Sequence, residues 1–123
     1  MNDHTLLLRQ IHPNWIKQNR VTSQVFQPTP KDENKLSVYD GDKITAENAF
    51  RHYTEQLRFR SAGVLAVSVC ECNELCLPAQ ADPTPFPEHA IIDFSHYSKS
   101  EQESKAKILR SFAVQRGWKY SSQ

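Results

Sequence analysis

Hydrophobic residues recur along the chain with two different periods, and these periods predict both strands and helices. Short apolar or alternating runs are typical of strands. The run from Val64 to Val69 is almost continuously apolar, which predicts a strand at the centre of a sheet. The other runs that predict strands are Thr5–Ile11, Val21–Phe26, Leu36–Tyr39, Leu75–Leu77 and His89–Phe94.

Apolar residues spaced by three or four positions predict two main helices. The first is expected over about 45–58, where Thr45 is a suitable N-cap and one face of the helical period is apolar. The second is expected over about 99–116. The serine and glutamate of Ser98-x-x-Glu101 have the spacing of a capping box, and Gly117 is a natural C-terminal stop.

The order of these elements is strands, helix, strands, helix, which predicts an α+β fold with a small mixed or antiparallel sheet. A chain of 123 residues forms one domain with an adequate core, so we expect residues 1–123 to be a single α+β domain. Four prolines within residues 78–87 predict an extended loop before the last strand.

The formal net charge is +1, which gives no general attraction to nucleic acid or to an anionic membrane. Charge is nevertheless uneven. Residues 71–93 contain acidic side chains and no Lys or Arg, whereas residues 99–119 are mainly basic. The sequence starts without a basic region ahead of its short apolar run, and no run is long enough to span a bilayer. We therefore expect a cytoplasmic protein.

Three cysteines lie close together in the sequence, at Cys70, Cys72 and Cys76. An odd number of cysteines without a secretory signal is typical of reduced thiols in a cytoplasm. Their spacing differs from the paired Cys-x-x-Cys elements of zinc sites. We therefore expect free thiols and no bound metal.

The first third of the chain places polar side chains beside large apolar residues at the ends of predicted strands. If Ser23 and Ser37 face the same cleft as Arg9 and His12, they form a cationic, hydroxyl-rich pocket suited to phosphate groups. Tyr39 lies on the same predicted strand as Ser37. The alternative is that the hydroxyls only pair neighbouring strands. The chain has three glycines and no glycine-rich phosphate loop, which argues against a P-loop or Rossmann site.

Two histidines are candidates for acid–base chemistry. His12 follows the first predicted strand, next to a proline, and is placed to act as a general base or to bind phosphate. His89 begins the last predicted strand beside Glu88. The alternative for both is a structural histidine bonded to nearby backbone. The candidate catalytic residues are His12, Ser37 and His89, and the candidate ligand-binding residues are Arg9, Ser23 and Tyr39.

Four segments together resemble the ADP-ribosyltransferase-like proteins, especially the RES-domain toxins that consume NAD. They are Leu6-Leu7-Leu8-Arg9, Leu36-Ser37-Val38-Tyr39, Thr45-Ala46-Glu47-Asn48-Ala49 and Val64-Leu65-Ala66-Val67. The resemblance covers roughly residues 5–94 in order and spacing. It implies NAD as cofactor, with Arg9 on the pyrophosphate and with Ser37 and Tyr39 in the pocket. The family's Gly-Arg-Trp-rich segment is missing, and the acidic catalytic residue would be Glu47 or Glu88.

These observations lead to a small bacterial or phage-type protein that binds a phosphate-bearing ligand, with an NAD-using toxin or effector as the enzymatic interpretation. The alternative is a non-catalytic interaction module, such as an immunity protein, antitoxin or accessory subunit. It would act through the acidic 71–93 surface or the basic C-terminal helix. Nucleic-acid binding through that helix has less support, because the net charge is near zero and no aromatic residues alternate with the basic ones.

Overall fold

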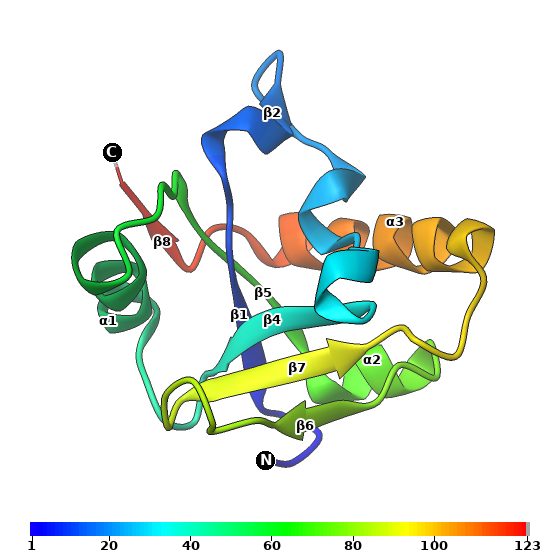
Figure 1. Ribbon diagram of the computed structural model, residues 1–123. Helices are drawn as coiled ribbons and strands as arrows, with labels where there is room; N and C mark the ends of the chain where they lie inside the picture. Colours follow the sequence, from blue (N-terminus) through cyan, green and yellow to red (C-terminus); the bar gives the residue numbers. More distant parts are fainter. Residues whose placement is uncertain (123) are drawn as a thin grey trace.

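A six-stranded sheet forms the centre of the computed structural model, which describes residues 1–122 (Figure 1). Its strands lie in the order β6-β7-β4-β1-β5-β8, and all neighbouring strands are antiparallel. The predicted α+β class is confirmed. Of the two predicted kinds of sheet, mixed or antiparallel, the antiparallel one is present. The strands are β1 (Leu6–Gln10), β4 (Lys35–Asp40), β5 (Gly63–Ser68), β6 (Ala79–Ala81), β7 (His89–Asp93) and β8 (Tyr120–Ser121).

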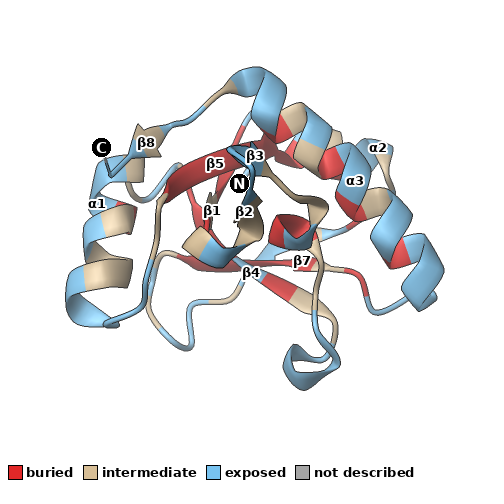
Figure 2. Ribbon diagram, turned by 90° about the horizontal axis from the view of Figure 1, so that it is seen from above, coloured by how far each residue is buried: buried red, intermediate tan, exposed pale blue. Residues whose placement is uncertain are grey.

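The other elements surround this sheet (Figure 2). A small separate sheet pairs two strands of two residues each. The helices and short strands are α1 (Ala46–Arg51), which continues as a π-helix (His52–Gln56), α2 (Val69–Glu74), α3 (Lys99–Arg116), β2 (Ile16–Lys17), β3 (Arg20–Val21) and the 3-10 helices Pro13–Trp15, Ser23–Phe26 and Pro30–Asp32.

Alternation along β1 divides the apolar core into two clusters. Leu7 lies in the larger cluster, together with Leu109 of α3. Its neighbour Leu8 lies in the smaller cluster, together with Ala49 of α1. Because successive residues of a strand point to opposite faces, α3 and α1 cover opposite faces of the sheet.

Both helices predicted from the sequence are present. α3 has the predicted bounds, and Ser98 and Glu101 form the expected capping box at its start. The helix predicted over 45–58 begins as α1, but its second half is wound as a π-helix. No helix within residues 1–122 has both the length and the apolar character needed to cross a bilayer.

The strand predicted over Val21–Phe26 is wrong. β3 ends at Val21, and Ser23–Phe26 form a 3-10 helix. Val25 and Phe26 are both completely buried, although an alternating strand would send these consecutive side chains to opposite faces. The 3-10 turn instead directs both into the cluster beneath α3.

The strand predicted over Leu75–Leu77 is also wrong, because this segment ends α2. The helix begins at Val69, where Ser68 and Glu71 form a capping box, so the apolar run of β5 continues directly into a helix. Cys76 adopts the left-handed conformation, with φ of 56°, and ends the helix. The proline-rich stretch that follows, which is predicted to be an extended loop, includes the short strand β6.

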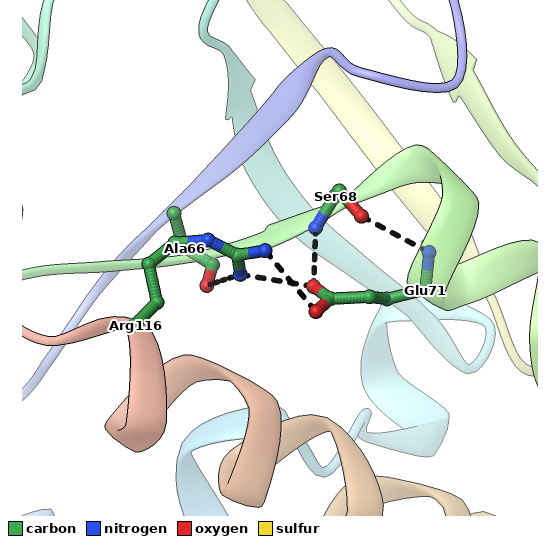
Figure 3. Close-up of polar contacts among 4 residues, drawn as sticks. All are labelled: Ala66, Ser68, Glu71 and Arg116. Atoms are coloured by element: carbon green, nitrogen blue, oxygen red, sulfur yellow. Dashed lines mark hydrogen bonds and ion pairs between the residues drawn. The ribbon is translucent and has the colours of Figure 1, made fainter.

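An ion pair joins the end of α3 to the start of α2 (Figure 3). The Arg116 guanidinium donates two hydrogen bonds to the Glu71 carboxylate, at 2.9 and 3.1 Å, and a third to the carbonyl of Ala66 in β5. Glu71 also accepts from the backbone N–H of Ser68. Burial alone raises the pKa of Glu71, but the hydrogen bonds from Arg116 and Ser68 outweigh it and lower the pKa below its usual value.

Replacing Arg116 with glutamine should lower the free energy of unfolding by about 1–3 kcal/mol at neutral pH, because a part-buried carboxylate loses a charged donor. The pKa of Glu71 is lower in the folded protein than in the unfolded chain. Its contribution is therefore present above about pH 4.3 and is lost as the pH falls through the lowered pKa. Urea denaturation from pH 7 to pH 3 measures both effects.

The matched control is Arg51→Gln, because Arg51 pairs with Glu47 at 3.5 Å on the surface, with side chains 60% and 53% exposed. This exposed pair should contribute about 0.3–0.5 kcal/mol. Equal losses in the two variants would show that the Arg116–Glu71 pair contributes no more than a surface ion pair.

Candidate functional site

A cavity lies where β1 and β4 separate. The two strands pair only at Leu7–Asp40 and Leu8–Tyr39, whereas β1 continues to pair with β5 as far as Gln10. Beyond Leu8 the strands diverge, which Figure 1 shows as a wide angle between them. The cavity has a volume of about 500 Å³, and its floor includes residues from both separated strands.

Aromatic side chains from several elements form the walls of this cavity. The π-helix that follows α1 contributes Tyr53, and the proline-rich loop before β7 contributes Phe86. The rings of Phe86 and Tyr39 pack together, with their centroids 5.2 Å apart. Trp15 and Phe59 complete the aromatic lining.

Arg9 contributes a positive charge to the cavity without an ion-pair partner among residues 1–122. Its Nε donates to the carbonyl of Val25 and its Nη1 to the carbonyl of Ser37, both at 2.9 Å. The guanidinium also lies 5.1 Å from the ring centre of Trp15. Burial lowers the pKa of Arg9 to about 10, so the side chain stays charged at neutral pH.

Gln10, which follows Arg9 in β1, brings a buried amide to the lining of the cavity. The side chain lines the cavity, and the residue is only 5% exposed. Its Oε1 accepts a hydrogen bond from the hydroxyl of Ser61 at 2.8 Å. Its Nε2 has no partner among residues 1–122. The Nε2 atom itself has almost no accessible surface, so it is an internal unsatisfied donor rather than an exposed group of the cavity wall.

Ser37 and His89 form a hydrogen bond inside the cavity. The hydroxyl of Ser37 lies 3.1 Å from Nε2 of His89, and both residues line the cavity wall. On the other side of the imidazole, Nδ1 lies 2.9 Å from the backbone carbonyl of Asp82 and 3.3 Å from its carboxylate. Strands β4 and β7, together with the residue after β6, thus hold a hydroxyl, an imidazole and a carboxylate in a row.

Tyr39 is a buried wall residue with its own hydrogen bond. Its hydroxyl lies 2.8 Å from Nδ1 of His52, at the start of the π-helix. Burial, followed by the nearby Tyr53 and Glu88, raises the pKa of Tyr39, so its hydroxyl stays protonated and uncharged. Burial likewise raises the pKa of Tyr53, although Arg9 acts in the opposite direction.

Four of the six candidate residues therefore lie around one cavity: Arg9, Ser37, Tyr39 and His89. The other two lie elsewhere. His12 is the N-cap of the 3-10 helix Pro13–Trp15, where its Nδ1 accepts from the N–H of Asn14.

Ser23 lies in a separate groove between the β2–β3 hairpin and α3. The basic residues of that groove are Lys17, Arg20, Lys107 and Arg110. The pocket predicted from Arg9, His12, Ser23 and Ser37 therefore does not form as one cleft, because Ser23 lies in this groove and His12 caps a 3-10 helix.

Sequence reasoning missed several cavity residues. Gln10 lies in the strand predicted over Thr5–Ile11, although an amide next to Arg9 in a mainly apolar run is a signal in itself. Tyr53 lies on the apolar face of the helix predicted over 45–58, and it lines the cavity from the π-helix. Asp32 also lines the cavity and is its one acidic side chain among residues 1–122. Asp82 carried no signal, because its contact with His89 depends on the β6–β7 pairing.

The cysteines lie away from this cavity and are all free. Cys72 is buried, and burial raises the pKa of its thiol to about 12, whereas Cys70 and Cys76 are exposed. Within residues 1–122, no three His, Cys, Asp or Glu side chains gather as a metal-binding group.

Comparisons with protein-family models, with curated proteins and with solved structures found no match to this chain.

Proposed function

We propose that the cavity between β1 and β4 binds a phosphate-bearing small molecule of the nucleotide type, with NAD among the candidates. The observation that carries the proposal is the charge of Arg9, which is half-buried beside aromatic rings, forms no ion pair among residues 1–122 and interacts with the carboxylate of Asp32 only beyond ion-pair distance. A cation that is partly withdrawn from water is costly to hold without a close counter-ion, and a bound anion relieves that cost. The two bonds to Val25 and Ser37 use two of its five N–H donors.

The rest of the lining supports a ligand that also carries a flat ring. Rings stack favourably on aromatic side chains, and Trp15, Tyr53 and Phe86 offer such surfaces. Asp32 offers an acceptor for a ribose hydroxyl or a ring amino group. A volume of about 500 Å³ lies within the usual range for small-molecule sites.

The proposal concerns binding, and an NAD-consuming reaction would need a carboxylate in the cavity. Glu47 pairs with Arg51 on the surface of α1, and Glu88 lies in neighbouring depressions outside this cavity. Neither of the acidic residues suggested by the family resemblance lines the site. Asp32 is the carboxylate that an ADP-ribosyl transfer would have available.

Titration with ADP-ribose, NAD, AMP and adenosine, followed by calorimetry and thermal shift, tests this proposal. We expect the phosphate-bearing ligands to bind more tightly than adenosine. Arg9→Gln should weaken their binding about 10- to 100-fold, because a charged hydrogen-bond donor to phosphate is lost. It should leave adenosine binding nearly unchanged.

Arg110→Gln is the matched control. Arg110 also donates from Nε to a backbone carbonyl, that of Val21, but it lies outside the cavity. Its replacement should leave nucleotide affinity unchanged. If the wild-type protein binds none of the four ligands, or if the two arginine variants behave alike, the proposal is wrong.

The alternative of a protein-interaction module has less support, because many of the charges it needs are engaged within the chain. In the acidic stretch, Glu71 pairs with Arg116 and Asp82 contacts His89. In the basic helix, Lys105 donates to the carbonyl of Leu75. We therefore favour ligand binding.

A further inference from the structure

Ser37 and His89 have the relative positions of a nucleophile and its base. Ser37 lies opposite Ile91 in the β4–β7 ladder, and Tyr39 lies opposite His89. Ser37 and Tyr39 are two residues apart and therefore share one face of the sheet, as do Ile91 and His89. This diagonal relation brings the hydroxyl of Ser37 to 3.1 Å from Nε2 of His89, which is within reach for proton transfer.

The contact with Asp82 determines which nitrogen of His89 carries the proton. A backbone carbonyl only accepts hydrogen bonds, so Nδ1, at 2.9 Å from the carbonyl of Asp82, must carry its hydrogen. In the neutral ring, Nε2 then holds a lone pair directed at the hydroxyl of Ser37. The carboxylate of Asp82, at 3.3 Å from Nδ1, is placed to stabilise the imidazolium that forms when Nε2 takes up a proton.

The exposure of Ser37 and the burial of His89 suit a nucleophile and its base. His89 is buried, with 8% exposure, and the ring of Phe86 packs at 5.2 Å against it, edge to face. Its imidazole is therefore held in one orientation. Ser37 is exposed, although its neighbours Leu36 and Val38 in β4 are buried. A solvent-reachable hydroxyl thus faces a fixed base at the wall of the cavity.

A donor for a developing negative charge lies in the same cavity. The carbonyl of Ser37 accepts from Arg9 of β1, so the backbone N–H of Ser37 points toward the same widening gap. A backbone N–H is among the groups that commonly stabilise the oxyanion in acyl transfer.

We propose that Ser37 is the nucleophile of an esterase site, with His89 as its general base and Asp82 as a positioning residue. The substrate class is a carboxylic ester that carries an anionic group. This last feature rests on the proposed function, because Arg9 would hold that group.

The reaction uses only the ester and water. Oγ of Ser37 bonds to the carbonyl carbon while its proton moves to Nε2 of His89. The bond from that carbon to the alcohol oxygen then breaks, and His89 returns the proton to the departing alcohol. Water next attacks the acyl-Ser37 ester with His89 as base, which releases the carboxylic acid and restores the serine hydroxyl.

A fluorophosphonate probe, which reacts with activated serines, tests the nucleophile directly. We expect one adduct on the wild-type protein by intact mass, located at Ser37 by peptide mapping, together with hydrolysis of p-nitrophenyl acetate. Both should be lost in Ser37→Ala and should slow at least 100-fold in His89→Gln. Ser111→Ala is the control, because Ser111 is an exposed serine of α3, and it should behave as the wild type.

Asp82→Asn tests the positioning role, with Asp82→Glu as the conservative variant. We expect a slower labelling rate in Asp82→Asn and partial recovery of that rate in Asp82→Glu, because the glutamate restores a carboxylate near Nδ1 of His89. Ser37 is exposed, so Ser37→Ala should fold normally, which circular dichroism verifies. A folded wild-type protein that takes up no probe and hydrolyses no ester overturns the inference, as does labelling that persists in Ser37→Ala.

The nucleotide titration separates this inference from the proposed function. If nucleotides bind in an Arg9-dependent way but Ser37 is never labelled, the esterase inference fails and the proposed function stands. If Ser37 is labelled but no nucleotide binds, the catalytic role holds for esters without the phosphate, and the proposed function fails.

Discussion

Replacing Phe26 with alanine should lower the free energy of unfolding by about 3–5 kcal/mol, which is a large part of the stability of a domain of this size. The side chain is completely buried in the cluster between the 3-10 helix Ser23–Phe26 and α3. Its removal leaves a cavity that the rigid sheet on one side cannot fill. Urea denaturation followed by circular dichroism measures the loss.

Gln24→Ala is the control in the same 3-10 helix, because Gln24 is exposed and its backbone carbonyl still accepts from Gln27. It should change stability by about 0.5 kcal/mol or less. If Phe26→Ala were equally mild, the segment would not be part of the core. The Phe26→Ala substitution should also disturb the cavity, because the carbonyl of the neighbouring Val25 accepts a hydrogen bond from Nε of Arg9.

Replacing Gly63 with alanine should cost about 3 kcal/mol or more. Gly63 has φ of 153°, and a Cβ atom would lie 2.5 Å from the carbonyl oxygen of Tyr120 and 3.0 Å from the ring of Trp118. The substitution therefore combines an unfavourable backbone conformation with a clash against β8. Thermal or urea denaturation measures the combined effect.

Gly117→Ala separates the two causes. Gly117 also has a positive φ, of 91°, but a Cβ atom there would meet no atom within 4 Å. It should lose only the conformational part, about 1–3 kcal/mol. Equal losses at the two glycines would mean that the close approach of Tyr120 to Gly63 adds nothing.

The sequence predicted elements well where local signals agreed. α3 carries a capping box, an apolar stripe and a terminal glycine, and each of these acts within a few residues. The segments 21–26 and 75–77 were predicted incorrectly because their hydrophobic residues are buried by distant partners. Val25 is apolar because α3 covers it, and no alternation pattern contains that information.

The site was harder to predict than the fold, because it depends on which residues of neighbouring strands lie opposite each other. Arg9, Ser37 and His89 were recognised as candidates from their places near strand ends. That Ser37 meets His89 depends on the pairing of β4 with β7 across 52 residues, which short-range patterns do not specify. Ser23 was misplaced for a related reason, since a 3-10 turn and a strand project the same residue in different directions.

The sheet ends in very short outer strands, with three residues in β6 and two in β8. Each border therefore presents only a few backbone donors and acceptors to another molecule. A strand of a neighbouring copy could form only a few backbone hydrogen bonds with either edge strand. The two edges of the sheet therefore give little opportunity for fibrous self-association.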